Sequence, residues 1–385
     1  MSLITFIKKN LKLISKRANE KNNRKKKFRI IYKEPEESLI FDYKGSGTFG
    51  DVFKVTNLTE NTNEIPKGKS VVIKIMKRKN SEPDRLLELS EIINNLKSKM
   101  IINKYIMNIY NIDFDKNVIF LEYVDGLPLD DYIRKNKLTN NELNIFFIKS
   151  LLSVKVMHNV LKYSHRDIKG PNIIYNPENG IMKCIDYGFI CNLKNFKCVN
   201  RYEGTGKYIH PDMNRKYKTY KKNSSVIFPN AVSQDLFSLL MTIFKLYYTS
   251  QNVKSIKSNS PNDFFSIFRK YEINIRKEKS KKNNNGRNKK SEIRFNSKND
   301  FLIELMELDI NNINNEVIKE IIKIFKKYWN FEKKDFYIKS INNILVTNFI
   351  FDLLIFNSFS SISDSEEKNN IFYDWCSIYS YNINF

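Results

Sequence analysis

Residues 165–172 read His-Arg-Asp-Ile-Lys-Gly-Pro-Asn, and this octet decides the interpretation of the whole chain. It sets one carboxylate, Asp167, between the two basic residues Arg166 and Lys169, and it places the amide of Asn172 five residues after that carboxylate. A polar loop with a buried histidine and a helix-capping aspartate would explain single positions. It does not explain several positions that agree at once. The octet therefore indicates a site that carries chemistry.

A glycine-rich run, Gly45-Ser46-Gly47-Thr48-Phe49-Gly50, precedes the octet and leads into Asp51 and Val52. Glycine at three positions lets backbone N–H groups approach phosphate oxygens without a side chain in the way. Such a run also suits a dinucleotide-binding turn or a plain flexible hairpin. The dinucleotide turn needs a helix directly after the last glycine, whereas Val52-Phe53-Lys54-Val55 alternates like a strand. We therefore predict a hairpin flap that covers phosphates.

Four more segments carry motif-like residues. They are Val71-Val72-Ile73-Lys74, the turn Asp186-Tyr187-Gly188 after the short strand 181–185, the run 204–212 (Gly-Thr-Gly-Lys-Tyr-Ile-His-Pro-Asp), and Ser233-Gln234-Asp235 at the start of an apolar stretch. Each segment by itself is a weak signal, because a lysine often ends a strand and Asp-x-Gly often forms a turn. Their order along the chain gives them weight.

Taken in this order, the segments resemble the motifs of eukaryotic-type serine/threonine protein kinases. The octet is similar to H-R-D-x-x-x-x-N, and the glycine-rich run is similar to G-x-G-x-x-G-x-V. The segments that begin at Val71, Asp186 and Gly204 are similar to V-A-I-K, D-F-G and G-T-x-x-Y-x-A-P-E, respectively. The resemblance covers about residues 39–350 and is dense up to Asp235. The chain departs from the pattern at Val72 (usually Ala), Tyr187 (usually Phe), His210 (usually Ala) and Asp212 (usually Glu).

The resemblance implies an α+β, bilobal protein-kinase-like fold with a small, mostly β N-lobe and a larger, mostly α C-lobe. It implies ATP and Mg²⁺ as the ligands. Asp167 would orient the attacking hydroxyl, Asn172 and Asp186 would hold the metal, and Lys74 would bind the α- and β-phosphates. Lys169 favours Ser/Thr hydroxyls as acceptors. Asp235 would steady the backbone of the catalytic loop.

The implied nucleotide site draws on the glycine-rich hairpin, the strand lysine and a hinge that follows the strand 118–121. Its residues are Lys44, Gly45, Ser46, Gly47, Thr48, Phe49, Gly50, Asp51, Val52, Lys74, Glu122 and Val124.

In the family, a glutamate on the next helix pairs with the strand lysine. Glu82-Pro83 predicts the start of that helix, and Leu86, Leu89, Ile93, Leu96 and Met100 recur at helical steps. Glu88 and Glu91 are both candidates for the partner of Lys74. Glu88 is preferred, because the residue four positions later, Ile92, is apolar, whereas Asn95 follows Glu91. For either glutamate taken alone, a solvated helix face is the commoner explanation.

The chain has 385 residues and a formal net charge of +24 with a pI of about 9.6. One interpretation is attraction to acidic partners, namely acidic protein substrates, nucleic acid or an anionic membrane; the basic run Arg215–Lys222 favours acidic residues around the target Ser/Thr. The other is that biased codons place lysines on a solvated surface, since the Lys/Asn bias is typical of AT-rich genomes, as in large DNA viruses or parasitic and amoeboid eukaryotes. Aromatic residues are not interleaved with arginine, so no nucleic-acid site is predicted.

Four cysteines without a C-x-x-C pair and three histidines predict free thiols in a reducing compartment and no zinc site. No signal peptide and no apolar run of transmembrane length is found, so we expect an intracellular protein. Leu3, Ile7, Leu11 and Ile14 share one helical face among lysines, which suggests peripheral contact with an anionic membrane or packing on the kinase lobe. The oligomeric state is not indicated.

The expected division is a basic extension (1–36), an N-lobe (37–122), a C-lobe (126–350) with a basic, disordered insertion (276–299), and a tail (351–385). The predicted function is ATP- and Mg²⁺-dependent transfer of phosphate to Ser/Thr of proteins. A small-molecule phosphotransferase of the same fold and a pseudokinase scaffold remain as alternatives. The first would usually lack Lys169, and the second would usually have lost Lys74, Asp167 or Asp186.

Overall fold

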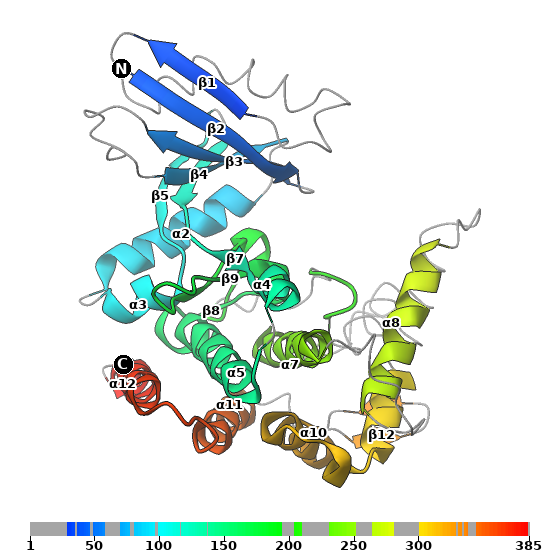
Figure 1. Ribbon diagram of the computed structural model, residues 1–385. Helices are drawn as coiled ribbons and strands as arrows, with labels where there is room; N and C mark the ends of the chain where they lie inside the picture. Colours follow the sequence, from blue (N-terminus) through cyan, green and yellow to red (C-terminus); the bar gives the residue numbers. More distant parts are fainter. Residues whose placement is uncertain are drawn as a thin grey trace, which may run out of the picture. The chain divides into compact units, whose positions relative to one another are not determined.

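The computed structural model divides into two compact units, Met1–Asp125 and Gly126–Phe385 (Figure 1). The residues described are 29–34, 37–46, 49–57, 70–77, 81–96, 99–115, 117–136, 138–194, 204–209, 231–251, 264–280, 300–328, 330–332, 335–337 and 344–383. Gly47, Thr48, the N-terminal segment 1–28 and the basic run 215–222 lie outside them, so the expectations for these residues stay expectations.

A six-stranded antiparallel sheet forms the body of the first unit, in the order β1-β2-β3-β4-β6-β5 (Figure 1). Its strands are β1 (Arg29–Glu34), β2 (Glu37–Ser46), β3 (Gly50–Asn57), β4 (Ser70–Met76), β5 (Ile109–Asp113) and β6 (Val118–Glu122). β3 alternates strictly, with Phe53 and Val55 fully buried, as its sequence predicts. β1 pairs with β2 inside the segment that we expected to be an extension, so the sheet begins earlier than predicted.

Helix α2 (Glu82–Asn95) begins at the predicted residue. Pro83 occupies the first turn, where its missing N–H leaves no hydrogen bond unmade. Leu86, Leu89 and Ile93 form its buried face. The helix ends at Asn95, and the highly exposed Met100 begins a separate short helix, α3 (Met100–Tyr105), so Met100 does not continue the helical steps of α2 as expected.

The second unit is mainly helical (Figure 1). Its helices are α4 (Leu129–Lys135), α5 (Asn140–Lys155), η1 (Val156–Val160), α7 (Ala231–Ser250), α8 (Phe264–Ser280), residues 300–307, α10 (Glu316–Tyr328), α11 (Ile344–Phe359) and α12 (Ser365–Ile383). Short elements are β7 (Leu127–Pro128), β8 (Tyr163–Ser164), η2 (Gly170–Asn172), β9 (Ile173–Tyr175), β10 (Met182–Cys184), η3 (Tyr187–Phe189), β11 (Cys191–Asn192), η5 (Ile310–Asn312), β12 (Asn330–Glu332) and β13 (Asp335–Tyr337).

Two helices, α5 and α7, supply much of the core that supports the site. A capping box starts α5: the Thr139 hydroxyl accepts from Glu142 N, and the Glu142 carboxylate accepts from Thr139 N at 2.7 Å. α5 then runs into the π turn η1, where the Leu161 N–H donates to the Val156 carbonyl oxygen. Because this turn carries one residue more than an α turn, it sets the rotation of the residues that precede the catalytic octet.

Two further expectations differ from the structure. Residues 276–280 continue α8, so the predicted disordered insertion does not begin at residue 276, and 281–299 lie outside the described part. The C-terminal tail forms α11 and α12, which pack on α5 and η1. Cys184 and Cys376 are free, as expected, but Cys191 is disulfide-bonded. No described helix is long and apolar enough to cross a membrane.

Candidate active site

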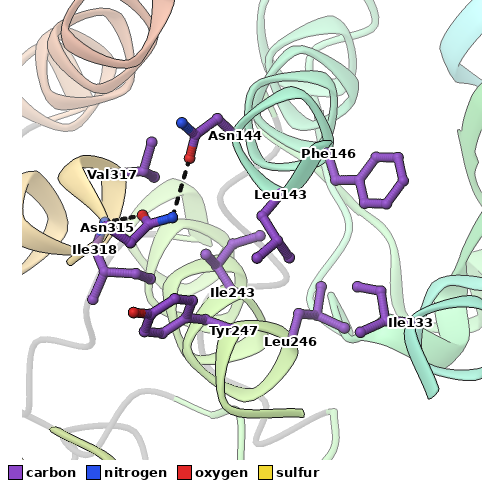
Figure 2. A pocket seen from close by; sticks show the side chains of 10 residues that line it. All are labelled: Ile133, Leu143, Asn144, Phe146, Ile243, Leu246, Tyr247, Asn315, Val317 and Ile318. Atoms are coloured by element: carbon purple, nitrogen blue, oxygen red, sulfur yellow. Dashed lines mark hydrogen bonds between the residues drawn. The ribbon is translucent and has the colours of Figure 1, made fainter. Parts of the chain in front are cut away.

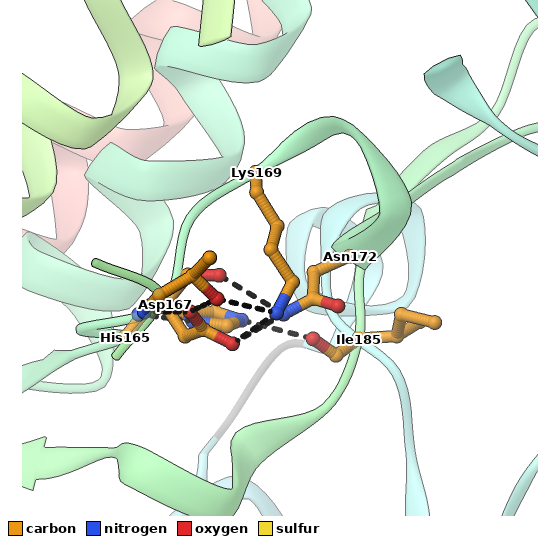
Figure 3. Close-up of polar contacts among 6 residues, drawn as sticks. His165, Asp167, Lys169, Asn172 and Ile185 are labelled. Carbon is orange, nitrogen blue, oxygen red and sulfur yellow. Dashed lines mark hydrogen bonds and ion pairs between the residues drawn. The ribbon is translucent and has the colours of Figure 1, made fainter. Parts of the chain in front are cut away.

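The carboxylate of Asp167 is almost fully buried in the loop between β8 and η2, and donors occupy both of its oxygens (Figure 3). Thr205 donates to Oδ1 through its backbone N at 2.8 Å and its hydroxyl at 2.7 Å. Lys169 Nζ lies 2.5 Å from Oδ2, and Asn172 Nδ2 lies 3.1 Å from the same oxygen. Lys169, Asn172 and Thr205 thus surround the carboxylate of Asp167.

Lys169 bridges Asp167 to the segment that follows Gly204. Its ammonium group donates to the Thr205 hydroxyl at 2.9 Å as well as to Asp167. Gly204 has a φ of +111°, and a Cβ there would overlap the carbonyl oxygen of Arg166. Only glycine can adopt this backbone conformation and also approach the Arg166 carbonyl so closely. Gly204 and Thr205 therefore pack directly against the octet.

Asp235, at the start of α7, anchors the backbone of the octet as predicted. Its carboxylate accepts from the backbone N–H groups of His165 and Arg166, each at 2.6 Å, and lies 2.8 Å from His158 Nε2. Arg166 holds a φ of +66°, an uncommon conformation for a residue with a side chain. The two short hydrogen bonds that this fully buried carboxylate accepts stabilise that conformation.

The pKa of Asp235 results from opposing effects. Burial raises the pKa, because it disfavours the charged form, but hydrogen bonds and charge from His158, the nearby His165 and the backbone of Arg166 outweigh it and lower the pKa below its usual value. A charged carboxylate can only accept, so His158 Nε2 must carry the hydrogen. Sequence reasoning missed His158; its position seven residues before His165 was the available signal.

The two predicted metal ligands lie on adjoining backbone segments. Ile185 N donates to Asn172 O at 2.9 Å, and Ile185 O lies 2.9 Å from His165 Nε2, so the residue before Asp186 is tied to the octet on both sides. Asn172 directs its Nδ2 toward Asp167, which leaves its amide oxygen to face elsewhere. One amide oxygen and one carboxylate fit a Mg²⁺ ion that takes its other ligands from phosphates and water. Among the described residues, no group of three His, Cys, Asp or Glu side chains could hold a metal.

Tyr187 fills the place of the usual phenylalanine. Its ring is buried against His165 at a centroid distance of 5.8 Å, and its hydroxyl donates to Cys184 O at 2.9 Å. The expectation that a buried tyrosine hydroxyl needs a partner is therefore confirmed.

In the first unit, the glycine-rich segment connects β2 to β3, as a hairpin requires. A Cβ on Gly50 would lie 2.6 Å from Ile75 O, so this position requires glycine for close strand packing. Beside it, Lys77 lies 3.3 Å from Asp51 and also donates to Ser46. Lys44 and Ser46 are exposed on β2.

Lys74 is buried on β4 and forms a buried ion pair, at 2.5 Å, with Glu82. The prediction of a partner on the following helix was right, but the choice of Glu88 was wrong, as was the alternative Glu91. Glu82 is the first residue of α2, where the positive end of the helix dipole favours a carboxylate. The signal was present in the sequence as the acidic residue before Pro83.

At the end of β6, the Glu122 carboxylate accepts from the backbone and side-chain amides of Asn108, at 2.9 and 3.1 Å. This side chain is used to fix the segment 106–108 to the strand end. Any contact of Glu122 with a nucleotide would therefore come from its backbone. Val124, two residues on, is half-buried.

The second unit also contains a pocket (Figure 2). Aliphatic side chains of α4, α5, α7 and α10 line it, together with the aromatic rings of Phe146 and Tyr247 and the amides of Asn144 and Asn315. The two amides meet at 3.5 Å, Asn144 donates to Ser361, and Asn315 accepts from Ile318 N, so the polar groups serve the packing of the helices. No residue of the octet takes part.

The model of the protein kinase domain family matches residues 42–334. The chain therefore belongs to the protein kinase family, whose members use ATP as a substrate together with divalent metal ions. It is similar to maternal embryonic leucine zipper kinase of Xenopus tropicalis (32% identical over 153 residues, 39% of this chain and 22% of the relative).

Two other relatives show the same pattern. Mitogen-activated protein kinase kinase kinase 5 of Mus musculus is 29% identical over 192 residues, 46% of this chain and 13% of the relative. The probable serine/threonine-protein kinase fnkB of Dictyostelium discoideum is 26% identical over 205 residues, 51% of this chain and 36% of the relative. The matched segment thus spans only a minor part of each relative.

Proposed function

We propose that this protein kinase transfers the γ-phosphate of ATP to Ser or Thr hydroxyls of protein substrates and uses Mg²⁺. The contact of Lys169 with both Asp167 and Thr205 is the observation that carries the proposal. The ammonium group of Lys169 lies beside the carboxylate that would bind the substrate hydroxyl. It can therefore neutralise negative charge on the phosphoryl group during its transfer. The named relative from Dictyostelium is a probable serine/threonine kinase, which supports the same acceptor.

Each residue has a defined task in this mechanism. Asp167 accepts a hydrogen bond from the substrate hydroxyl and directs its oxygen toward the phosphorus. To do so it exchanges the Thr205 hydroxyl, which now donates to Oδ1, for that of the substrate. Lys169 remains beside both groups. Positioning and charge neutralisation then supply most of the rate, because phosphoryl transfer needs little covalent chemistry from the protein.

The oxygen ligands Asn172 Oδ1 and the Asp186 carboxylate fit Mg²⁺, which when bound neutralises the phosphate oxygens. Lys74 would bind the α- and β-phosphates. In the present structure its ammonium group is held by Glu82, so phosphate binding either adds to this pair or replaces it.

The decisive experiment is transfer of radiolabel from [γ-³²P]ATP to casein and to a basic protein, followed by phosphoamino-acid analysis. We expect labelled phosphoserine or phosphothreonine, and a loss of several orders of magnitude in Asp167→Ala. Asp131→Ala, an exposed aspartate on α4, is the matched control and should retain activity. Labelling of an amino sugar or choline but of no protein would instead support a small-molecule phosphotransferase. Absence of all transfer would support a pseudokinase.

A further inference from the structure

Helices α11 and α12 lie beyond the family match, which ends at residue 334, yet they pack on the elements that lead to the octet. α11 contacts α5, α7 and α10, and α12 contacts α5 and η1 (Figure 1). These two helices, called the C-terminal addition below, can act on the catalytic loop only through the residues that they contact.

Two buried lysines anchor the C-terminal addition to α5. Lys155, fully buried, forms an ion pair with Asp352 of α11, and Trp375 of α12 donates to the same carboxylate at 3.4 Å. Lys149 lies 2.7 Å from both Gly180 O and Glu367 of α12. Burial lowers the pKa of Lys155 and Asp352 partly offsets this, so the lysine depends on its partner. The two helices are thus fixed in position rather than loosely attached.

The contact that matters for the octet is made by Phe351. Its side chain is fully buried, and its ring meets the His158 ring edge-on, with centroids 5.6 Å apart and planes at 89°. His158 Nε2 bonds Asp235, but its Nδ1 is buried and has no hydrogen-bond partner among the described residues. One hydrogen bond leaves the ring free to rotate about it, so packing must fix the ring plane.

We propose that α11 positions the catalytic loop: Phe351 fixes the His158 ring, His158 orients Asp235, and Asp235 holds the backbone of His165 and Arg166. Phe351 and His158 are positioning residues that touch no reacting atom. The effect on turnover rests on the proposed kinase function, whereas the effect on loop order does not.

The test compares Phe351→Leu with Phe356→Leu in the full chain. Phe356 lies on the same helix, is 66% exposed and serves as the matched control. Hydrogen exchange of the His165 and Arg166 amides should become about tenfold faster in the Phe351 variant, because their acceptor loses its orientation, and should not change in the control. With ATP and protein substrate, kcat should fall roughly ten- to hundredfold while KM for ATP stays within about twofold.

Protection of the α12 amides from hydrogen exchange shows whether α11 and α12 remain docked. If Phe351→Leu does not fold, the same measurements are made on Phe351→Met. Exchange at His165 and Arg166 equal to that of the control, in a folded variant, overturns the proposal. Faster exchange with an unchanged kcat overturns its catalytic part. If the wild-type protein transfers no phosphate, the proposed function fails, but the exchange result still decides the positioning role.

Discussion

Lys74 pairs with Glu82, the residue that opens α2, and not with a glutamate in the middle of that helix. The pair is buried on both sides, so each charge depends on the other for compensation. Glu82 therefore ties the predicted phosphate-binding lysine to the point where the chain enters α2.

Glu82→Gln should lower the free energy of unfolding by about 3 kcal/mol, because it removes the carboxylate charge that pairs with the buried ammonium group of Lys74. Glu88→Gln, on the same helix but half-buried, should change it by about 0.5 kcal/mol or less. Urea denaturation of the two variants measures both values. Equal losses would show that Glu82 has no special relation to Lys74.

Asp186→Ala should abolish phosphate transfer and leave the fold intact, because we assign its carboxylate to the metal and its side chain is exposed. Circular dichroism checks the fold, and single-turnover labelling checks the transfer. Turnover like that of the wild type in a purified sample would sink the proposed mechanism.

Gly126→Ala should destabilise the second unit by about 2 kcal/mol. Gly126 has a φ of +133°, and a Cβ would overlap the carbonyl oxygen of Tyr175 on β9. Gly45→Ala is the control, since no atom of the described residues lies within 4 Å of a Cβ there. The comparison is made by thermal unfolding, and a Gly126 variant as stable as the Gly45 variant would contradict the close approach.

The thiol of Cys184 should resist alkylation at pH 8, whereas the exposed Cys376 should react. Burial raises the pKa of Cys184 to about 12, so at pH 8 the reactive thiolate is scarce and rises only as the pH approaches that value. Iodoacetamide labelling of the native protein, followed by mass spectrometry of peptides, measures both sites. Labelling of Cys184 at the rate of Cys376 would count against the buried position.

A preference for acidic residues around the target Ser or Thr is expected from the net charge of +24 and from the basic run 215–222. Initial rates on a peptide array should favour acidic peptides, and the preference should weaken as salt rises, because exposed charges are screened. Selection of basic peptides would reverse this expectation.

The sequence was sufficient for whatever depends on local spacing. The octet, the strand that follows Gly50, the start of α2 at Glu82-Pro83 and the anchor Asp235 were all located by residue number. These features arise from turns, periodicity and fixed loop lengths, which a linear pattern records.

The choice between Glu82 and Glu88 was not accessible in this way. Both lie on α2, and the rotation of the helix about its axis, which decides which carboxylate meets Lys74, is set by how Leu86, Leu89 and Ile93 pack. The docking of α11 was missed for a related reason. Its apolar residues are spread around the whole helix, so no single face predicts a partner, and the ring of His158 becomes its neighbour only in the folded chain.

The π turn at Val156–Val160 has a consequence for insertions and deletions. Loss of one residue there would restore an α turn and rotate everything before it by about 100° relative to the octet. Lys149 and Lys155 would then turn away from Glu367 and Asp352, while the sequence of the octet would be unchanged. A variant of this kind would pass any motif search and still lose the support of its catalytic loop, so chain length at this point is as constrained as residue identity elsewhere.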